Sequence, residues 1–182
     1  MTLLKTMIIV GAAAGVAAGG TSAALAQATM TEPPDRVQQA AVIASDADFV
    51  RKAVAGNRYE IEAGQLAVIL ATDRRLKDFA GMMIIDHTAA LEKLEEAARA
   101  AGAPIPPSAG PDATQRAKID ALKGMTGIAF DQQYKAEQKQ AHENTMALLL
   151  AYKEDGKDAG LRAWAGEAIL TVLKHREALN AL

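Results

Sequence analysis

The apolar and small residues of segment 46–71 recur at steps of four and three, the spacing that keeps them on one face of an α-helix. Ser45 or Asp46 stands where such a helix needs an N-cap. One member of the row is charged, namely Glu60. The pattern predicts a long helix with a buried face made of Phe49, Ala53, Gly56, Glu60, Ala63, Ala67 and Leu70.

A second row of the same spacing covers about residues 74–101 and includes His87 at a position where an aliphatic side chain would pack better. Thr72 or Asp73 is the expected N-cap, and Gly102 is the expected end. The prolines of the following stretch exclude helix there and predict a long crossover loop. The row consists of Leu76, Ala80, Met83, His87, Ala90, Leu94, Ala97 and Ala101.

A short helix is expected over about 113–123, where Gly124 and Gly127 end it, and two long helices follow over about 128–153 and from 159 to the end. Four long helices of similar length predict an all-α fold, an antiparallel four-helix bundle over residues 46–182 with a long crossover loop and a short extra helix. The inner faces of the last two long helices carry Phe130, Tyr134, Gln138, His142, Thr145 and Leu149, and then Leu161, Ala165, Ala168, Val172, His175, Leu179 and Leu182.

The first 26 residues have the layout of a secretory signal peptide. Lys5 precedes a short apolar run, and Ala24-Leu25-Ala26 matches the small-x-small cleavage pattern. An uncleaved membrane anchor is the alternative, but cleavage would leave no stable membrane span. Residues 27–45 include a Pro-Pro pair and are expected to form a flexible leader. The sequence thus predicts a periplasmic or secreted protein of the bacterial envelope.

Composition narrows the chemistry. The chain contains no cysteine, which excludes a disulfide, a thiolate metal site and a cysteine nucleophile. Its formal net charge is −2, and removal of Lys5 with the signal peptide would make it −3. Aromatic residues make up 4% of the chain, so neither charge nor base stacking favours a nucleic acid partner. The sequence does not identify a protein partner.

The three histidines and Glu60 are expected to lie at similar heights in the bundle. The point midway between Glu60 and His87 falls in the first predicted turn, and that between His142 and His175 falls in the last one. Antiparallel helices joined by a short turn place such pairs level with each other. His87 and His142 each lie 15 residues from the glycine that bounds their helices, Gly102 and Gly127 respectively. If those glycines share one end of the bundle, all four side chains form one layer.

A buried layer of three imidazoles and one carboxylate has two stable states, because unpaired buried polar groups cost about 1–3 kcal/mol each. The groups hydrogen-bond to one another, or they bind a metal ion. Nitrogen and carboxylate ligands suit one divalent transition metal: Zn²⁺, Fe²⁺, Mn²⁺ or Cu²⁺. The predicted ligands are Glu60, His87, His142 and His175.

Three further polar residues are candidates to support these ligands by hydrogen bonds: Asn57, Asp86 and Asp131. Asp86 adjoins His87 but points about 100° away from it on a helix of 3.6 residues per turn, so it either caps or orients another side chain. Asp131 lies in the first turn of its helix, where a carboxylate stabilises the positive end of the helix dipole.

Four stretches of the chain resemble successive helices of one exported bacterial family: "FVRKAVAGNRYEIEAGQLA", "LKDFAGMMIIDHTAALEKL", "FDQQYKAEQKQAHENTMALL" and "LKHREAL". This is domain-of-unknown-function family 4142 (DUF4142), which is placed with the ferritin-like bundles. The resemblance covers about residues 45–182 and implies a ferritin-like fold and an envelope location. It does not imply a reaction.

A di-iron centre is not expected in this bundle, because carboxylate-bridged di-iron bundles use Glu-x-x-His motifs. Ile84, Lys139 and Val172 stand three residues before the histidines, so the motif is absent. The leading hypothesis is a bundle that binds one metal ion for sensing, buffering or stress protection. The second is a structural or interaction module with a hydrogen-bonded buried layer. An enzyme is the third, since the sequence shows no catalytic motif.

Overall fold

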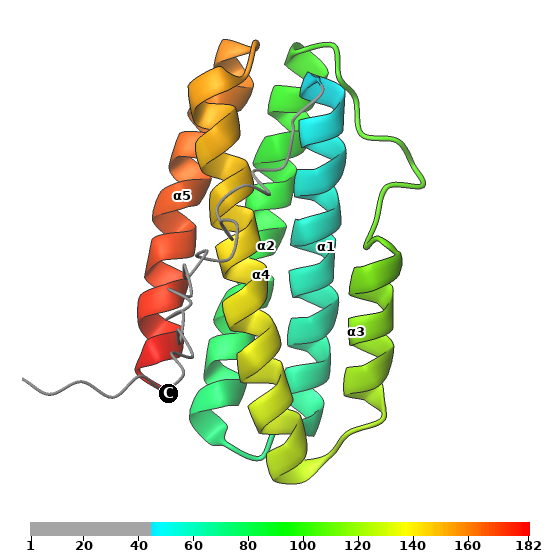
Figure 1. The fold of residues 1–182 in the computed structure, drawn as a ribbon, viewed down its shortest axis with the longest axis vertical. Coiled ribbons are helices and arrows are strands. Elements are labelled where there is room, and N and C mark those ends of the chain that lie inside the picture. Colours follow the sequence, from blue (N-terminus) through cyan, green and yellow to red (C-terminus); the bar gives the residue numbers. More distant parts are fainter. Residues whose placement is uncertain (1–44) are drawn as a thin grey trace, which may run out of the picture. The chain divides into compact units, whose positions relative to one another are not determined.

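Five α-helices make up the part of the chain that the computed structural model describes, residues 45–182, and this part contains no strand (Figure 1). The predicted signal peptide and most of the predicted leader lie outside the described residues. The expectation of an all-helical bundle is confirmed. The helices are α1 (Asp46–Leu70), α2 (Arg74–Ala100), α3 (Ala113–Lys123), α4 (Gly127–Asp155) and α5 (Ala159–Asn180).

The four long helices form a ring in the order α1, α2, α5, α4, and each packs against its two neighbours in that ring. Helices α1 and α5 run in one direction, whereas α2 and α4 run in the other, so every neighbouring pair is antiparallel (Figure 1). The short helix α3 lies outside the ring against α1 and α4. A single crossover, made of the proline-containing loop and α3, therefore connects α2 to α4.

Local side-chain chemistry starts the helices where the sequence predicts. Ser45, Asp73, Asp112 and Asp158 each occupy an N-cap position and accept a backbone N–H from the first helical turn. These bonds satisfy amides that have no partner inside the helix. Gly102 follows α2 with a φ of 69°, a left-handed conformation that ends a helix without the strain a side chain would bring.

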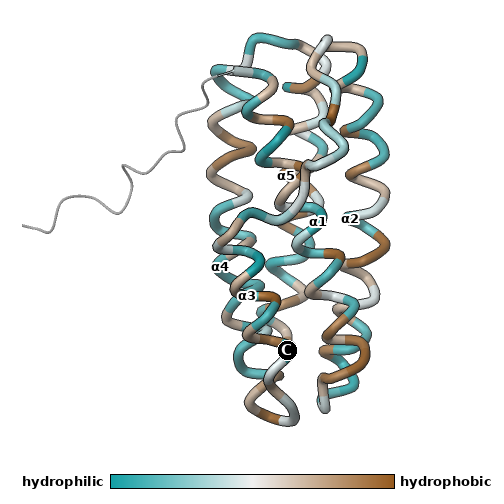
Figure 2. Tube along the Cα trace, turned by 90° about the vertical axis from the view of Figure 1, so that its right-hand side faces the viewer, coloured by the Kyte–Doolittle hydropathy of each residue, from teal (hydrophilic) through white to brown (hydrophobic). Residues whose placement is uncertain are grey.

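The apolar core consists of two clusters, one toward each end of the bundle. One cluster contains the stacked rings of Phe49 and Tyr152, whose centroids lie 3.7 Å apart, together with Trp164. The other includes Met83 and Phe130. Hydrophobic and hydrophilic residues alternate along each helix, as the tube in Figure 2 shows, because only one face of each helix is buried. Between the two clusters, at mid-height, lies a layer of buried polar side chains.

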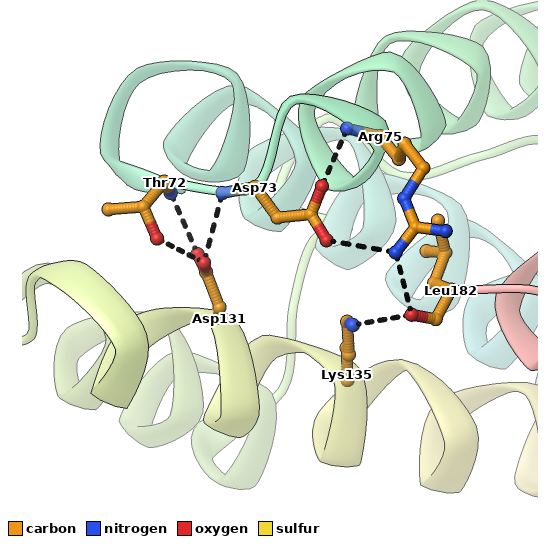
Figure 3. Close-up of polar contacts among 6 residues, drawn as sticks. All are labelled: Thr72, Asp73, Arg75, Asp131, Lys135 and Leu182. Atoms are coloured by element: carbon orange, nitrogen blue, oxygen red, sulfur yellow. Dashed lines mark hydrogen bonds and ion pairs between the residues drawn. The ribbon is translucent and has the colours of Figure 1, made fainter.

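The direction of α4 corrects one premise of the predicted layer. Near the start of α4, Asp131 accepts hydrogen bonds from the backbone N–H groups of Thr72 and Asp73, at 2.9 and 3.0 Å (Figure 3). The start of α4 thus lies beside the α1–α2 connection, while α2 ends at the far end of the bundle. Gly102 and Gly127 therefore lie at opposite ends and not at one end.

The histidines are nevertheless level for a different reason. Helices α2 and α4 have nearly the same length, 27 and 29 residues, and both run from the same end of the bundle. His87 and His142 each lie near the middle of their helix. Two helices that run in parallel from a common end place such residues at a common height.

None of the helices that the structure describes combines the length and the apolar character that a membrane crossing requires.

Candidate metal centre

Three imidazole rings from three different helices meet in the middle of the bundle. His87 comes from α2, His142 from α4 and His175 from α5, and their side chains are 7%, 1% and 0% exposed. The ring centroids lie 5.2 to 6.3 Å apart. One ring nitrogen of each histidine lies within 4.8 Å of those of the other two. This is the arrangement of a group that could hold a metal ion.

The outward nitrogen of His142 is held by its own helix. Nδ1 lies 2.7 Å from the backbone oxygen of Gln138, one helical turn earlier. A carbonyl oxygen can only accept a hydrogen bond, so Nδ1 carries the proton. The neutral ring therefore presents an unprotonated Nε2, which is buried and has no hydrogen-bond partner.

The outward nitrogen of His87 is held by α1. Nδ1 lies 2.9 Å from Oδ1 of Asn57, and Nδ2 of the same amide donates to the backbone oxygen of Ala53 at 2.8 Å. The second bond fixes the orientation of the amide, so the oxygen faces the imidazole and must accept from it. Nε2 of His87 is thereby left unprotonated and buried without a partner.

The third ring is oriented by a carboxylate. Nε2 of His175 lies 3.0 Å from Oδ2 of Asp86, which also pairs with the ammonium of Lys174 at 3.2 Å. The proton therefore belongs on Nε2, and the buried Nδ1 is left without a partner. A carboxylate that accepts from an imidazole in this way fixes the ring and raises its basicity as a metal ligand.

The three rings are neutral at ordinary pH. Burial lowers the pKa of His87 to about 3, with a further decrease from the neighbouring His175 and His142. Burial likewise lowers the pKa of His142 to about 4, although the bond to the backbone opposes the decrease. The pKa of His175 is also lowered by burial, against the opposing effect of Asp86. Each inward nitrogen thus keeps a free lone pair at pH 7.

The spacing of the three inward nitrogens suits a first-row transition metal if the rings move slightly closer together. Nitrogens within 4.8 Å of one another lie at most about 2.8 Å from a common centre. Zn–N bonds measure about 2.0–2.1 Å, so each ring needs to move inward by about 0.7 Å or less.

Glu60 lies outside the group of closely spaced side chains that the three histidines form. Its Oε2 accepts from Nε2 of Gln138 at 2.6 Å, and its Oε1 lies 3.8 Å from Nδ1 of His142, the nitrogen that already donates to the backbone. Its carboxylate is not part of the group of mutually close donors. Burial raises the pKa of Glu60 to about 8, with a smaller opposing effect from the Gln138 bond, so the group carries a proton at pH 7. The expected four-ligand set is therefore reduced to three in this geometry.

The three supporting candidates lie in two different places. Asn57 and Asp86 contact His87 and His175, as described above. Asp131 does not contact the histidines, because its carboxylate binds the α1–α2 connection at the end of the bundle (Figure 3). It stabilises the connection that leads into α2, because the crossover places α4 beside that turn.

Gln138 links the two halves of the polar layer, although no role was expected for it. Its backbone oxygen accepts from His142, and its side chain donates to Glu60. The sequence indicated this role only through the position of Gln138 on the predicted inner face, four residues before His142. Side chains at positions i and i+4 adjoin on a helix.

An all-helical bundle with three convergent, unprotonated imidazole nitrogens in its core belongs to the class of helical bundles with a candidate transition-metal centre. The chain belongs to the family described as Domain of unknown function (DUF4142), whose model matches residues 31–182. Searches of curated proteins and of solved structures gave no match.

Proposed function

We propose that this protein is an exported, ferritin-like helical bundle that binds one divalent transition-metal ion in its core. The ligands are Nε2 of His87, Nε2 of His142 and Nδ1 of His175. The family membership and the single crossover support the ferritin-like assignment. The signal-like pattern of residues 1–26 supports export to the periplasm or the medium.

One observation carries the metal assignment. All three inward nitrogens are acceptors, because the outward nitrogen of each ring holds the proton. Three acceptors cannot hydrogen-bond to one another, so the layer is not a self-sufficient hydrogen-bonded network. A cation satisfies all three lone pairs at once. This argues against the alternative in which the layer serves only to fix the register of the bundle.

The ligand type narrows the choice of metal. Neutral imidazoles suit Zn²⁺, Cu²⁺ and Fe²⁺ better than Mn²⁺, which prefers oxygen ligands. Without Glu60 as a ligand, Mn²⁺ becomes the least suitable of the four expected ions. Asp86 adds one negative charge next to the ligands and partly balances the charge of the ion. Holding a single ion in this way suits metal sensing, buffering or protection under stress.

Metal content and ligand substitutions test this proposal. The protein is purified from periplasm without a histidine tag, its bound metals are measured by elemental analysis, and its thermal unfolding is followed with and without EDTA. We expect about one equivalent of metal per chain and a lower melting temperature in EDTA. A ligand present at 100 times its dissociation constant stabilises the folded state by about 2.7 kcal/mol.

The substitutions His87→Ala, His142→Ala and His175→Ala should each abolish stoichiometric binding, while circular dichroism reports whether each variant folds. Glu60→Gln is the matched control, because it alters the same polar layer without removing one of the three ligands; it should retain the metal. Unchanged metal content in a variant that lacks all three histidines would exclude the proposed site. Loss of the metal in Glu60→Gln would restore the four-ligand set.

A further inference from the structure

Helix α1 is the one long helix that supplies no ligand to the proposed metal ion. Helices α2, α4 and α5 each supply one imidazole, whereas α1 presents Gly56 and Asn57 at this level. The oxygen of Asn57 is already used by His87, and Gly56 has no side chain. Three nitrogens do not complete the coordination of a tetrahedral metal ion, which takes a water or another small ligand in the remaining position.

A small cavity adjoins one of the three proposed ligands, His87. It has a volume of about 40 Å³ and lies next to His87, between all four long helices. About half of the residues that line it are small, and these include Ala53, Gly56, Ala90, Thr145 and Ala168. A cavity needs about 10–15 Å³ of such volume to hold one water molecule, whereas drug-sized ligands occupy about 300 Å³ or more. The space therefore suits a ligand of very few atoms.

A larger cavity leads toward this space from the outside. It measures about 430 Å³ and lies between α1, α4, α3 and the crossover loop. Four residues line both cavities: Lys52, Gly56, Thr145 and Leu148. A Cβ atom added at Gly56 would meet only the hydroxyl of Thr145, at 4.0 Å, so the space in front of this glycine is open. Gly56 and Thr145 therefore lie where the two cavities adjoin.

We propose that a metal ion held by the three histidines keeps one coordination position open toward the small cavity, and that this position takes an exogenous ligand of up to three heavy atoms. Water, hydroxide and small linear anions belong to this class. The ligand enters past Gly56, and the hydroxyl of Thr145 is placed to hydrogen-bond to it. This inference rests on the proposed metal site and adds that the site is accessible and selects by size.

Cobalt substitution tests both statements separately. Co²⁺ is added to the metal-free full chain, and its visible absorption spectrum reports whether the ion is bound. Azide is then titrated as the probe ligand. We expect a saturable change in the spectrum of the wild-type protein. Acetate and benzoate, which have more than three heavy atoms, should produce a progressively smaller change.

Substitution at Gly56 then tests the entry path. Gly56→Leu fills the space in front of His87, so it should keep the cobalt spectrum and weaken azide binding about tenfold or more, which corresponds to about 1.4 kcal/mol. Gly56→Ala adds a single methyl group and provides a variant that folds readily if leucine does not. Gly81→Leu is the matched control on α2, because nothing lies within 4 Å of a Cβ atom there, and it should bind azide like the wild type.

The outcomes separate the two proposals. A wild-type protein that binds no Co²⁺ refutes the metal site and the open position together. A cobalt spectrum that azide does not change leaves the metal site standing and refutes the open position. Wild-type azide affinity in both Gly56 variants refutes entry through this cavity.

Discussion

Replacement of Glu60 by glutamine should make the metal-free protein much more sensitive to acid between pH 7 and pH 5. Glu60 and the histidines change the free energy of unfolding in opposite directions as the pH falls. In the wild type the two changes partly cancel, whereas the variant retains only the decrease that the histidines cause. EDTA is present throughout, because a bound metal would change the protonation of the ligands.

The histidine contribution is a loss of stability as the pH falls. His87 and His142 have pKa values of about 3 and 4 in the folded protein, against about 6.5 when unfolded. Below pH 6.5 the unfolded chain binds protons at these rings and the folded protein does not. From pH 7 to pH 5 this difference lowers the free energy of unfolding by about 2 kcal/mol per ring, or about 4 kcal/mol in total. His175 acts in the same direction.

Glu60 contributes the opposite change. The pKa of Glu60 is about 8 in the folded protein, whereas an unperturbed glutamate has a pKa of 4.5. The folded state therefore holds a proton that the unfolded state releases above pH 4.5. This stability is present at low pH and is lost as the pH rises toward 8. From pH 7 to pH 5 it increases the free energy of unfolding by about 2–3 kcal/mol.

The two effects leave a net decrease of about 1–2 kcal/mol in the wild type and about 4 kcal/mol or more in Glu60→Gln. Urea unfolding at pH 7, 6 and 5, followed by circular dichroism, measures the difference. Glu143→Gln, which alters an exposed glutamate of α4, is the control and should follow the wild type. Equal pH dependence in Glu60→Gln and the wild type would show that Glu60 is ionised in the folded protein and would refute this account.

Three other substitutions have distinct expected outcomes. Asp86→Asn should weaken metal binding about 10- to 100-fold, because it removes the carboxylate that orients His175; metal affinity from a competition titration checks this, and an unchanged value would contradict it. Asp131→Ala should cost about 2–3 kcal/mol, since it removes the charged acceptor of several hydrogen bonds at the α1–α2 connection, yet it should leave metal affinity unchanged. Gly64→Ala should cost about 1–3 kcal/mol in urea unfolding, because its Cβ atom would lie 2.9 Å from a side-chain carbon of Ile84; a more stable variant would show that α1 and α2 separate at no cost.

The position of each helix was readable from the sequence because capping and hydrophobic spacing are local. Ser45, Asp73 and Gly102 mark helix ends within one or two residues of the structure. The choice of the three histidines as one group also followed from spacing, since a residue near the middle of a long helix stays near the middle of the bundle. Both predictions depended only on the immediate neighbours of a residue and on the length of its helix, and both of these can be read from the sequence.

The ligand geometry could not be derived in the same way. Glu60 and the histidines all lie on the buried faces of their helices. Only the packing of the helices decides that the carboxyl group of Glu60 turns toward Gln138 and not into the histidine group. The proton on each ring depends on acceptors from other helices or other turns, such as Asn57 and Asp86. A sequence gives the height and the face of a side chain, but its direction depends on rotamers that the neighbouring helices select.

The sequence by itself thus determined five helices, their buried faces and the candidate histidines, because these follow from interactions between residues a few positions apart. Only the tertiary structure decided that α4 runs parallel to α2, that Asp131 serves the α1–α2 connection, and that three nitrogens face one another without a proton between them. Those features depend on contacts between segments 30 to 90 residues apart, and the path of the crossover and the packing of four helices set them.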